Sequence, residues 1–325
     1  MSSAPFVFVT RQLPEPGIEL LLQAGYEVDV WPEDRPIDRA VLLNKVAQCD
    51  AVISMLTDSI DEEVFDHAPQ LKVVANFAVG FNNIDVALAR ERGIEVTTTP
   101  NVLTDATADL AFGLLLAAAR RFTEGEQLVR SGNWDGWTPT QLLGRPVAGQ
   151  TLGIVGMGAI GQAVARRAKG FGMSIVYHNR RRVDVAIEEE LAARYVSLDE
   201  LFSQSDFISL HAPLNDESRH LVNADSLAKM KETAIIVNTA RGPLIDEVAL
   251  SDALQKKRIF AAGLDVFAEE PIIEPQLMTL PNVVMMPHLG SATVTARRDM
   301  VELCCRNILA VLQNQPALTP APAVN

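Results

Sequence analysis

Residues 151–170 read TLGIVGMGAIGQAVARRAKG, and this stretch decides the fold of the larger part of the chain. An apolar run of strand length is followed at once by a G-x-G-x-x-G motif and then by a helical pattern. In that context the first glycine permits a tight turn, the second lets a pyrophosphate approach the backbone, and the third lets helix and strand pack closely. The helix N-terminus adds unpaired N–H groups for phosphate. The stretch therefore predicts a dinucleotide site at Gly156, Gly158, Ala159, Ile160 and Gly161.

Short apolar runs alternate with helical patterns both before and after this motif. Strands that alternate with helices predict parallel sheets whose two faces are covered. We therefore expect an α/β protein with two doubly wound parallel-sheet domains, a Rossmann dinucleotide-binding domain and a smaller flavodoxin-like substrate domain. The expected strands are 6–10, 26–30, 51–55, 71–75 and 94–98 in the smaller domain, and 151–155, 174–178, 206–211, 234–238, 260–266 and 282–286 in the larger one.

Pro100 interrupts the first alternation, and a long apolar helical stretch follows it at 104–121. One more helical stretch lies near the C-terminus, at 292–313, before a tail rich in Pro and Ala that we expect to be disordered. The predicted domains are 1–99 together with 289–325, and 100–288. Two chain crossings of this kind predict a hinge.

The composition excludes several classes of protein. The 325 residues carry 28 basic and 41 acidic side chains, a formal net charge of −13, which makes nucleic acid a poor partner. The longest apolar run, 110–119, is shorter than the ~20 residues that span a bilayer, and the N-terminus lacks a signal-peptide pattern. We expect a cytoplasmic protein without membrane contact. Cys49, Cys304 and Cys305 lack the spacing of a zinc site or a disulfide framework, so we expect buried thiols and no metal.

The end of the strand at 174–178 bears on which dinucleotide binds. Chains that bind NAD usually carry Asp or Glu about 20 residues beyond the glycine motif, where it bonds the ribose 2′-hydroxyl. Here the strand ends in Asn179-Arg180-Arg181-Arg182, without an acid. Guanidinium groups donate paired hydrogen bonds to phosphate. The alternative is a solvated basic loop, but the missing acid favours NADP(H) over NAD(H), held by Asn179, Arg180 and Arg181.

A cation, a carboxylate and a histidine follow three other strands of the same predicted sheet. They are Arg241, Glu270 and His288. Ligands of open α/β sheets bind beyond the carboxyl ends of the strands. An arginine there can hold the carboxylate of a 2-oxo acid, a histidine can protonate its carbonyl oxygen, and a glutamate can orient the imidazole and stabilise its protonated form. Each residue alone would be an ordinary surface or packing residue, whereas together beside the glycine motif they predict a catalytic site.

The phrases VNTARGPLIDE, GLDVFAEEP and PHLGSAT resemble the D-isomer-specific 2-hydroxyacid dehydrogenases, as do VGFNNIDVALARERGI and VLTDATADLAFGLLLAAARR. Within that family the linker and glycine motif are most similar to NADPH-dependent glyoxylate/hydroxypyruvate reductases. The resemblance implies a homodimer that reduces glyoxylate to glycolate and hydroxypyruvate to D-glycerate. It also implies that the N–H groups of Val79 and Gly80 bind the substrate carboxylate. Arg241 would clamp that carboxylate, Glu270 would partner His288, and the cofactor would be lined by Thr107, His211, Ala212, Pro213, Thr239, Ala240 and Asp265.

Val79 stands where phosphite dehydrogenases carry a lysine, and Glu270 where formate dehydrogenases pair the histidine with a glutamine, so neither activity is expected. Leu56 is a candidate wall for a short substrate, or merely a packed loop residue. Trp134 or Trp137 is a candidate to close a neighbouring subunit's pocket, or part of an interface without a catalytic role. Two alternatives stay open. One is a broader 2-ketoacid reductase acting on 2-ketogluconate or phenylpyruvate, and the other is a dinucleotide-sensing interaction protein similar to transcriptional corepressors.

Overall fold

The computed structural model describes residues 4–322, and the chain forms two compact units. Unit 1 combines the residues up to Leu103 with those from Ser291 onward, and unit 2 is Thr104–Gly290. The chain thus passes between units at 103/104 and 290/291, close to the 99/100 and 288/289 expected from the sequence.

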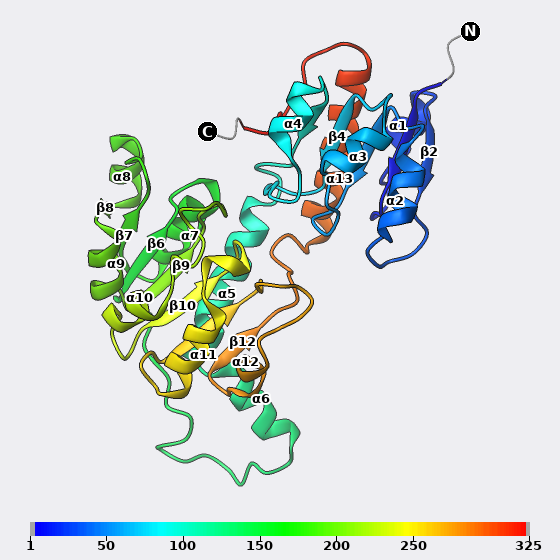
Figure 1. Ribbon diagram of the computed structural model, residues 1–325. Helices are drawn as coiled ribbons and strands as arrows, with labels where there is room; N and C mark the ends of the chain where they lie inside the picture. The colour runs from blue at the N-terminus through cyan, green and yellow to red at the C-terminus, as the bar shows by residue number, and fades with distance from the viewer. Residues whose placement is uncertain (1–3, 323–325) are drawn as a thin grey trace. The chain divides into compact units, whose positions relative to one another are not determined.

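Unit 1 is built on a parallel sheet in the order β2-β1-β3-β4-β5, the flavodoxin-like arrangement expected from the sequence. Figure 1 labels β2 and β4 of this sheet and the helices of the unit. Its central strands are buried on both faces because helices cover them. All three cysteines are buried free thiols, as predicted. The strands are β1 Phe6–Val9, β2 Glu27–Val30, β3 Ala51–Ser54, β4 Val73–Asn76 and β5 Glu95–Thr97. The helices are α1 Glu19–Gln23, α2 Arg39–Val46, α3 Glu62–His67, α4 Val86–Glu91 and α13 Val294–Leu312.

Unit 2 is built on a seven-stranded parallel sheet in the order β12-β11-β10-β9-β6-β7-β8. From β8 to β11 this is the Rossmann order, which reverses between β6 and β9 and so creates the point where such sheets bind ligands. Strand β8 was not predicted, because three residues at a sheet edge carry little apolar pattern. The strands are β6 Thr151–Val155, β7 Ser174–His178, β8 Ala193–Tyr195, β9 Phe207–Leu210, β10 Ile235–Asn238, β11 Ala261–Leu264 and β12 Val283–Met285. The helices are α5 Thr104–Ala119, α6 Phe122–Arg130, α7 Ala159–Gly170, α8 Val185–Leu191, α9 Leu198–Gln204, α10 Ala224–Lys229, the 3-10 turn Gly242–Leu244, α11 Glu247–Gln255 and α12 Pro275–Thr279.

Helix α5 is a core helix of unit 2. It packs on strands β10 and β11 and on helix α7. Gly263 of β11 makes the close approach possible, because a Cβ there would lie 3.0 Å from the Cβ of Leu114. No helix in the described part of the chain is long and apolar enough to cross a membrane.

The expectation of a disordered C-terminal tail is wrong for the residues the structure describes. The Ala321 N–H donates to the Val96 carbonyl at 2.7 Å, beside the edge strand β5. Upstream, the buried Asn307 side chain accepts the N–H groups of Leu318 and Thr319 at 2.9 and 3.0 Å. Composition could not reveal these partners, the Val96 carbonyl and the Asn307 side chain, because folding brings them to the tail. Residues 323–325 lie outside the described chain.

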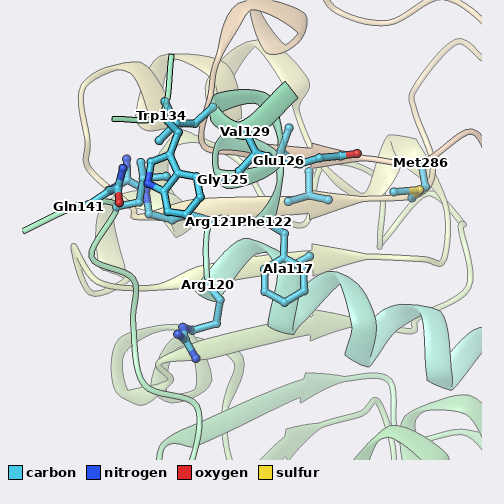
Figure 2. A pocket seen from close by; sticks show the side chains of 14 residues that line it. Ala117, Arg120, Arg121, Phe122, Gly125, Glu126, Val129, Trp134, Gln141 and Met286 are labelled. Carbon is cyan, nitrogen blue, oxygen red and sulfur yellow. The ribbon is translucent and has the colours of Figure 1, made fainter. Parts of the chain in front are cut away.

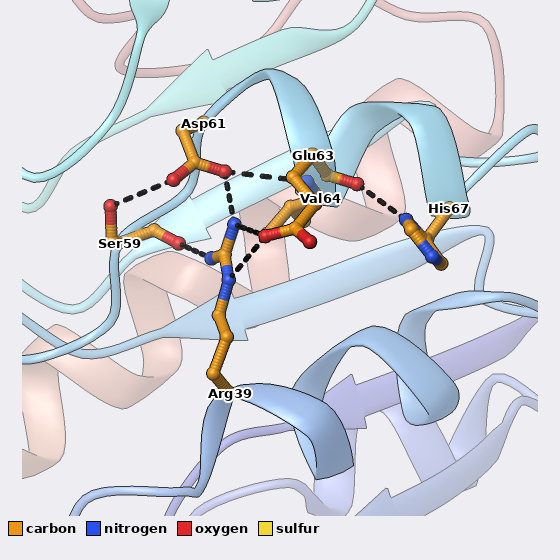
Figure 3. Close-up of polar contacts among 6 residues, drawn as sticks. All are labelled: Arg39, Ser59, Asp61, Glu63, Val64 and His67. Atoms are coloured by element: carbon orange, nitrogen blue, oxygen red, sulfur yellow. Dashed lines mark hydrogen bonds and ion pairs between the residues drawn. The ribbon is translucent and has the colours of Figure 1, made fainter.

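A polar cluster ties α2 to the start of α3 within unit 1 (Figure 3). The Arg39 guanidinium donates to the Ser59 carbonyl at 2.6 Å, to Asp61, and to Glu63 Oε2 at 2.8 Å. Exposed pairs of this type contribute about 0–1 kcal/mol each. The cluster therefore explains how two helices are held together on one sheet face and does not by itself indicate a site.

Candidate active site

The glycine motif forms the turn between β6 and α7, and two of its glycines are required by the chain's own packing. Gly156 has φ +97°, and a Cβ there would lie 2.6 Å from the backbone of His211 and Ala212. A Cβ at Gly161 would lie 2.2 Å from the Gly156 carbonyl oxygen. Gly156 thus lets the turn pack against the loop after β9, and Gly161 lets α7 pack against the turn itself.

Gly158 differs, because a Cβ there would meet no protein atom within 4 Å. It is also the N-cap of α7, and no side chain caps the helix. The first-turn N–H groups, including those of Ala159 and Ile160, are therefore available beside open space. This combination of room and donors fits the pyrophosphate of a dinucleotide.

The arginine run after β7 is divided between two environments. The Arg182 guanidinium is engaged with Glu188, its Nε and Nη2 lying 2.7 and 2.6 Å from the two carboxylate oxygens. Arg180 is exposed and has an ion pair only at 4.0 Å, with Glu217. Arg181 is exposed, and no hydrogen bond or ion pair of its side chain is found within residues 4–322. Two guanidiniums are thus accessible to an anion.

His288 and Glu270 meet at the carboxyl edge of the same sheet. His288 Nδ1 lies 2.7 Å from Glu270 Oε2, while Glu270 Oε1 accepts the Phe267 N–H at 3.0 Å. Burial tends to raise the pKa of Glu270, but the His288 contact and the Phe267 N–H outweigh it and lower that pKa. The carboxylate is therefore ionised at neutral pH. Because Nδ1 is engaged by Glu270, Nε2 is the ring nitrogen that can address a substrate.

The backbone at His288 is held in a strained conformation by Asp265. His288 has φ +57°, a left-handed conformation that costs about 1–3 kcal/mol for a non-glycine residue. Its N–H donates to the Asp265 carbonyl at 2.9 Å. The buried Asp265 carboxylate accepts the next two N–H groups, of Leu289 at 2.6 Å and Gly290 at 2.7 Å. The sequence suggested only a contact of Asp265 with the nicotinamide, so this positioning of the histidine turn was missed.

Arg241 lies beyond β10 on a loop that the Asn238 side chain organises. Asn238 donates to the Arg241 carbonyl at 2.8 Å and accepts the Ala240 N–H at 3.0 Å. The guanidinium is largely buried, which lowers the pKa of Arg241 against the opposing influence of the Glu270 carboxylate. A Cβ at Gly242 would lie 1.9 Å from the Phe267 carbonyl carbon, so the arginine loop adjoins the segment that leads to Glu270. Asn238 was not predicted, although it ends a buried strand.

The other predicted cofactor residues line the same edge of the unit 2 sheet. His211, followed by Ala212 and Pro213, comes after β9; its Nε2 lies 2.8 Å from Ser209 Oγ, and burial lowers its pKa to about 4. Thr239 carries a buried hydroxyl that has no hydrogen-bond partner among the described residues. Thr107 on α5 adjoins the histidine turn, since a Cβ at Gly290 would lie 3.4 Å from Thr107 Cγ2.

The predicted substrate residues of unit 1 follow two adjacent strands. Leu56 lies in the turn after β3, and Val79 and Gly80 lie in the loop after β4. Two buried side chains missed by sequence reasoning hold these loops. Asp58 accepts the Thr10 hydroxyl at 2.5 Å and the Met55 N–H at 2.7 Å. Asn76 donates to the Gly80 carbonyl at 2.8 Å.

The sequence model of the D-isomer specific 2-hydroxyacid dehydrogenase NAD-binding domain matches residues 112–290, more than half of the chain. The chain belongs to the D-isomer-specific 2-hydroxyacid dehydrogenase family. A glyoxylate reductase of Thermococcus kodakarensis is 54% identical over 310 residues, covering 94% of this chain and 92% of the relative. A glyoxylate reductase of Thermococcus litoralis is 49% identical, covering 98% of this chain and 99% of the relative.

Solved structures of other proteins share the fold of this chain. A protein from Thermus thermophilus has a TM-score of 0.92 and 46% identity, covering 98% of this chain and 100% of its own. The NADPH-dependent glyoxylate/hydroxypyruvate reductase of Sinorhizobium meliloti, solved with NADP and malonate, has a TM-score of 0.86 and 34% identity. The match covers 98% of this chain and 97% of the reductase.

This chain also has an open pocket of about 650 Å³ in unit 2, and none of the predicted site residues lines it. Figure 2 shows Trp134 and Gln141 on one side of it and Met286 on the other, with α6 residues between. Trp137, not among its lining residues, is 81% exposed. Among residues 4–322 no three His, Cys, Asp or Glu side chains are grouped so as to hold a metal ion.

Proposed function

We propose that this protein is an NADPH-dependent reductase of small 2-oxo acids, converting glyoxylate to glycolate and hydroxypyruvate to D-glycerate. The observation that carries the proposal is the pair of His288 and Glu270, 2.7 Å apart, on the same sheet edge as an uncapped glycine turn. The named activity of relatives about 50% identical supports the substrate class. Unit 2 is assigned to the cofactor and unit 1 to substrate recognition.

When bound, the nicotinamide cofactor supplies the hydride that reduces the carbonyl carbon. The Arg241 guanidinium binds the substrate carboxylate and polarises the carbonyl, an interaction that burial strengthens. The N–H groups of Val79 and Gly80 bind the same carboxylate. His288 donates the Nε2 proton to the carbonyl oxygen, and the ionised Glu270 keeps the imidazole oriented for the transfer.

The proposed preference for NADPH rests on Arg180 and Arg181, which are accessible beyond β7 where an NAD-binding chain would carry an acid.

A homodimer through unit 2 is supported by large apolar side chains left exposed around α6, with Phe122 and Val129 each 59% exposed. Trp134 and Trp137 belong to the same surface and are candidates to reach a partner. A cytoplasmic location completes the proposal.

The test is NADPH oxidation at 340 nm with glyoxylate, hydroxypyruvate, pyruvate, 2-ketogluconate and phenylpyruvate, repeated with NADH. We expect fast turnover of the first two acids with NADPH. A His288→Ala variant purified in parallel serves as the control, and it should lose about 10²–10⁴-fold in kcat while still binding NADPH. Turnover restricted to the bulky acids would support the broader reductase. Tight NADPH binding without turnover of any acid would support the sensing protein.

A further inference from the structure

The arginine loop after β7, residues 179–182, is anchored at its first residue. Asn179 Oδ1 accepts the Met157 N–H at 2.6 Å, which ties it to the glycine turn. The Tyr195 hydroxyl donates to the Asn179 carbonyl at 3.1 Å, which ties it to the edge strand β8. The position of this end is therefore set relative to the cradle that would hold the pyrophosphate.

The other end of the loop is anchored by buried side chains of β7 and α8. The fully buried Tyr177 donates its hydroxyl to Glu188 Oε1 at 2.5 Å and accepts the Val183 N–H at 3.1 Å. Glu188, only 7% exposed, receives both Nε and Nη2 of Arg182. We call Tyr177, Arg182 and Glu188 the Glu188 clamp. It leaves Arg180 and Arg181 as the exposed span between two fixed ends.

We propose that the Glu188 clamp is a specificity-determining device that positions Arg180 and Arg181 for the 2′-phosphate of NADPH. The inference rests on the proposed NADPH preference and deepens it. A flexible loop would have to be ordered when the phosphate binds, and that ordering would weaken the affinity. A loop held at both ends presents its guanidiniums already in place, so the advantage is felt only by a ligand that carries the phosphate.

The charge of Glu188 is compatible with this role. Its hydrogen bonds from Arg182 and Tyr177 lower its pKa to about 2, so the carboxylate is ionised in any neutral buffer. The paired Arg182 cancels its charge, and it comes nine residues after Asn179 rather than at the strand tip. It therefore anchors the loop and does not take the place of the acid that bonds a ribose 2′-hydroxyl in NAD-binding chains.

Glu188→Gln tests the inference, because an amide cannot accept both guanidinium hydrogen bonds and the tyrosine hydroxyl bond as an anion does. The readout is calorimetric binding of two probes, adenosine 2′,5′-bisphosphate, which carries the 2′-phosphate, and AMP, which lacks it. We expect about tenfold weaker binding of the bisphosphate and unchanged binding of AMP. The KM for NADPH should rise similarly, with kcat and the KM for NADH unchanged.

Glu190→Gln is the matched control on the same helix, since Glu190 is exposed and pairs with Arg166 at 2.7 Å. It should leave the binding of both probes unchanged. Tyr177→Phe provides a second variant if Glu188→Gln does not fold. It removes only the hydroxyl that joins Glu188 to Val183 and should shift the same ratio in the same direction by a smaller factor.

Three results would overturn the inference. They are equal losses for both probes, no change for either, or tighter bisphosphate binding, which would mean that a released Arg182 serves the phosphate. The double variant Arg180→Ala/Arg181→Ala separates this inference from the proposed function. If the double variant loses phosphate selectivity and Glu188→Gln retains it, the clamp alone is wrong. If the double variant keeps full selectivity, both proposals fall.

Discussion

At the residue scale, the site depends on a histidine in a conformation it would not adopt alone. The φ of +57° at His288 is compensated by the three hydrogen bonds to Asp265 and by the contact with Glu270. Strain of this kind persists only where the surroundings over-determine the backbone. The ring orientation and the turn geometry are thus set by two different carboxylates.

Glu270→Gln should therefore lower kcat/KM for glyoxylate reduction by about 10–100-fold, because the amide cannot stabilise a protonated imidazole as an anion does. Since the pKa of Glu270 is lowered, the parent carboxylate stays ionised from mildly acidic to alkaline pH. The loss should therefore persist across pH 5 to 9, a range in which the parent Glu270 stays charged. A pH–rate profile over this range measures it, with the exposed neighbour Glu269→Gln as control. An unchanged kcat/KM in Glu270→Gln would contradict the role assigned to Glu270.

Asp265→Asn should act on the same histidine through the backbone. One amide oxygen can accept one of the two N–H groups, but the NH2 group cannot accept the other, so the turn at His288 loses a fixed contact. We expect a fall in kcat of about tenfold or more with the KM for NADPH within about twofold of the parent value. Steady-state kinetics with saturating glyoxylate measures both. A large rise in that KM with normal kcat would instead favour the direct nicotinamide contact.

At the element scale, the β6–α7 turn separates glycines needed for folding from one left open to a ligand. Gly156 and Gly161 lie against backbone, whereas Gly158 faces space that the protein does not fill. The motif predicts a different role for each glycine, and the packing around Gly156, Gly158 and Gly161 agrees with those roles. The turn thus allows folding and cofactor binding to be altered independently.

Gly158→Val should lower the free energy of unfolding by no more than about 1 kcal/mol, the loss expected from a poorer N-cap residue, and reduce NADPH affinity by at least about tenfold. Its φ of −76° suits any residue, and the added side chain would occupy only the open space. Gly156→Val is the comparison, and it should destabilise the fold itself, since φ is +97° and the Cβ would meet backbone at 2.6 Å. Urea unfolding and NADPH titration measure the two effects. A destabilised Gly158→Val with normal affinity would refute the assignment of the cradle.

The sequence predicted the elements best where apolar runs are long and bounded, as at β6 and β7, whose limits are those expected. It missed the three-residue edge strand β8 and helix α6, none of whose residues is buried. The pairing of His288 with Glu270 was also expected. The supporting residues Asn238, Asp58 and Glu188 were missed because a polar side chain in the sequence does not by itself show which nearby backbone group or side chain it will bond.

At the scale of the whole molecule, a formal charge of −13 opposes the approach of an anionic cofactor and an anionic substrate. Salt screens that repulsion beyond about 8 Å at physiological ionic strength. In the proposed function, recognition of both anions would then depend on a few guanidiniums, chiefly those of Arg180, Arg181 and Arg241. Their effect is local, so they act on affinity more than on long-range steering.

The preference for NADPH over NADH should weaken as pH falls from 7.5 to 5. Arginines keep their charge in this range, and Glu188, with a pKa of about 2, keeps the clamp intact. The 2′-phosphate takes up a proton with a pKa of about 6, so only the ligand loses charge. The ratio of dissociation constants for NADPH and NADH, measured by fluorescence titration, should move toward unity by a few-fold. A constant ratio would indicate that the phosphate is not held by charge.

The tail that pairs beside β5 has a consequence for the protein in storage and expression. β5 is the edge of the unit 1 sheet, and an uncovered parallel edge is a template for strand addition by another molecule. The bridge between Thr97 and Pro320 and the bond from Ala321 to Val96 occupy part of that edge with a segment, 316–322, that carries three prolines. Chains clipped after Gln315 would therefore keep both sheets and yet aggregate on concentration, which makes proteolysis of the last ten residues the event to guard against.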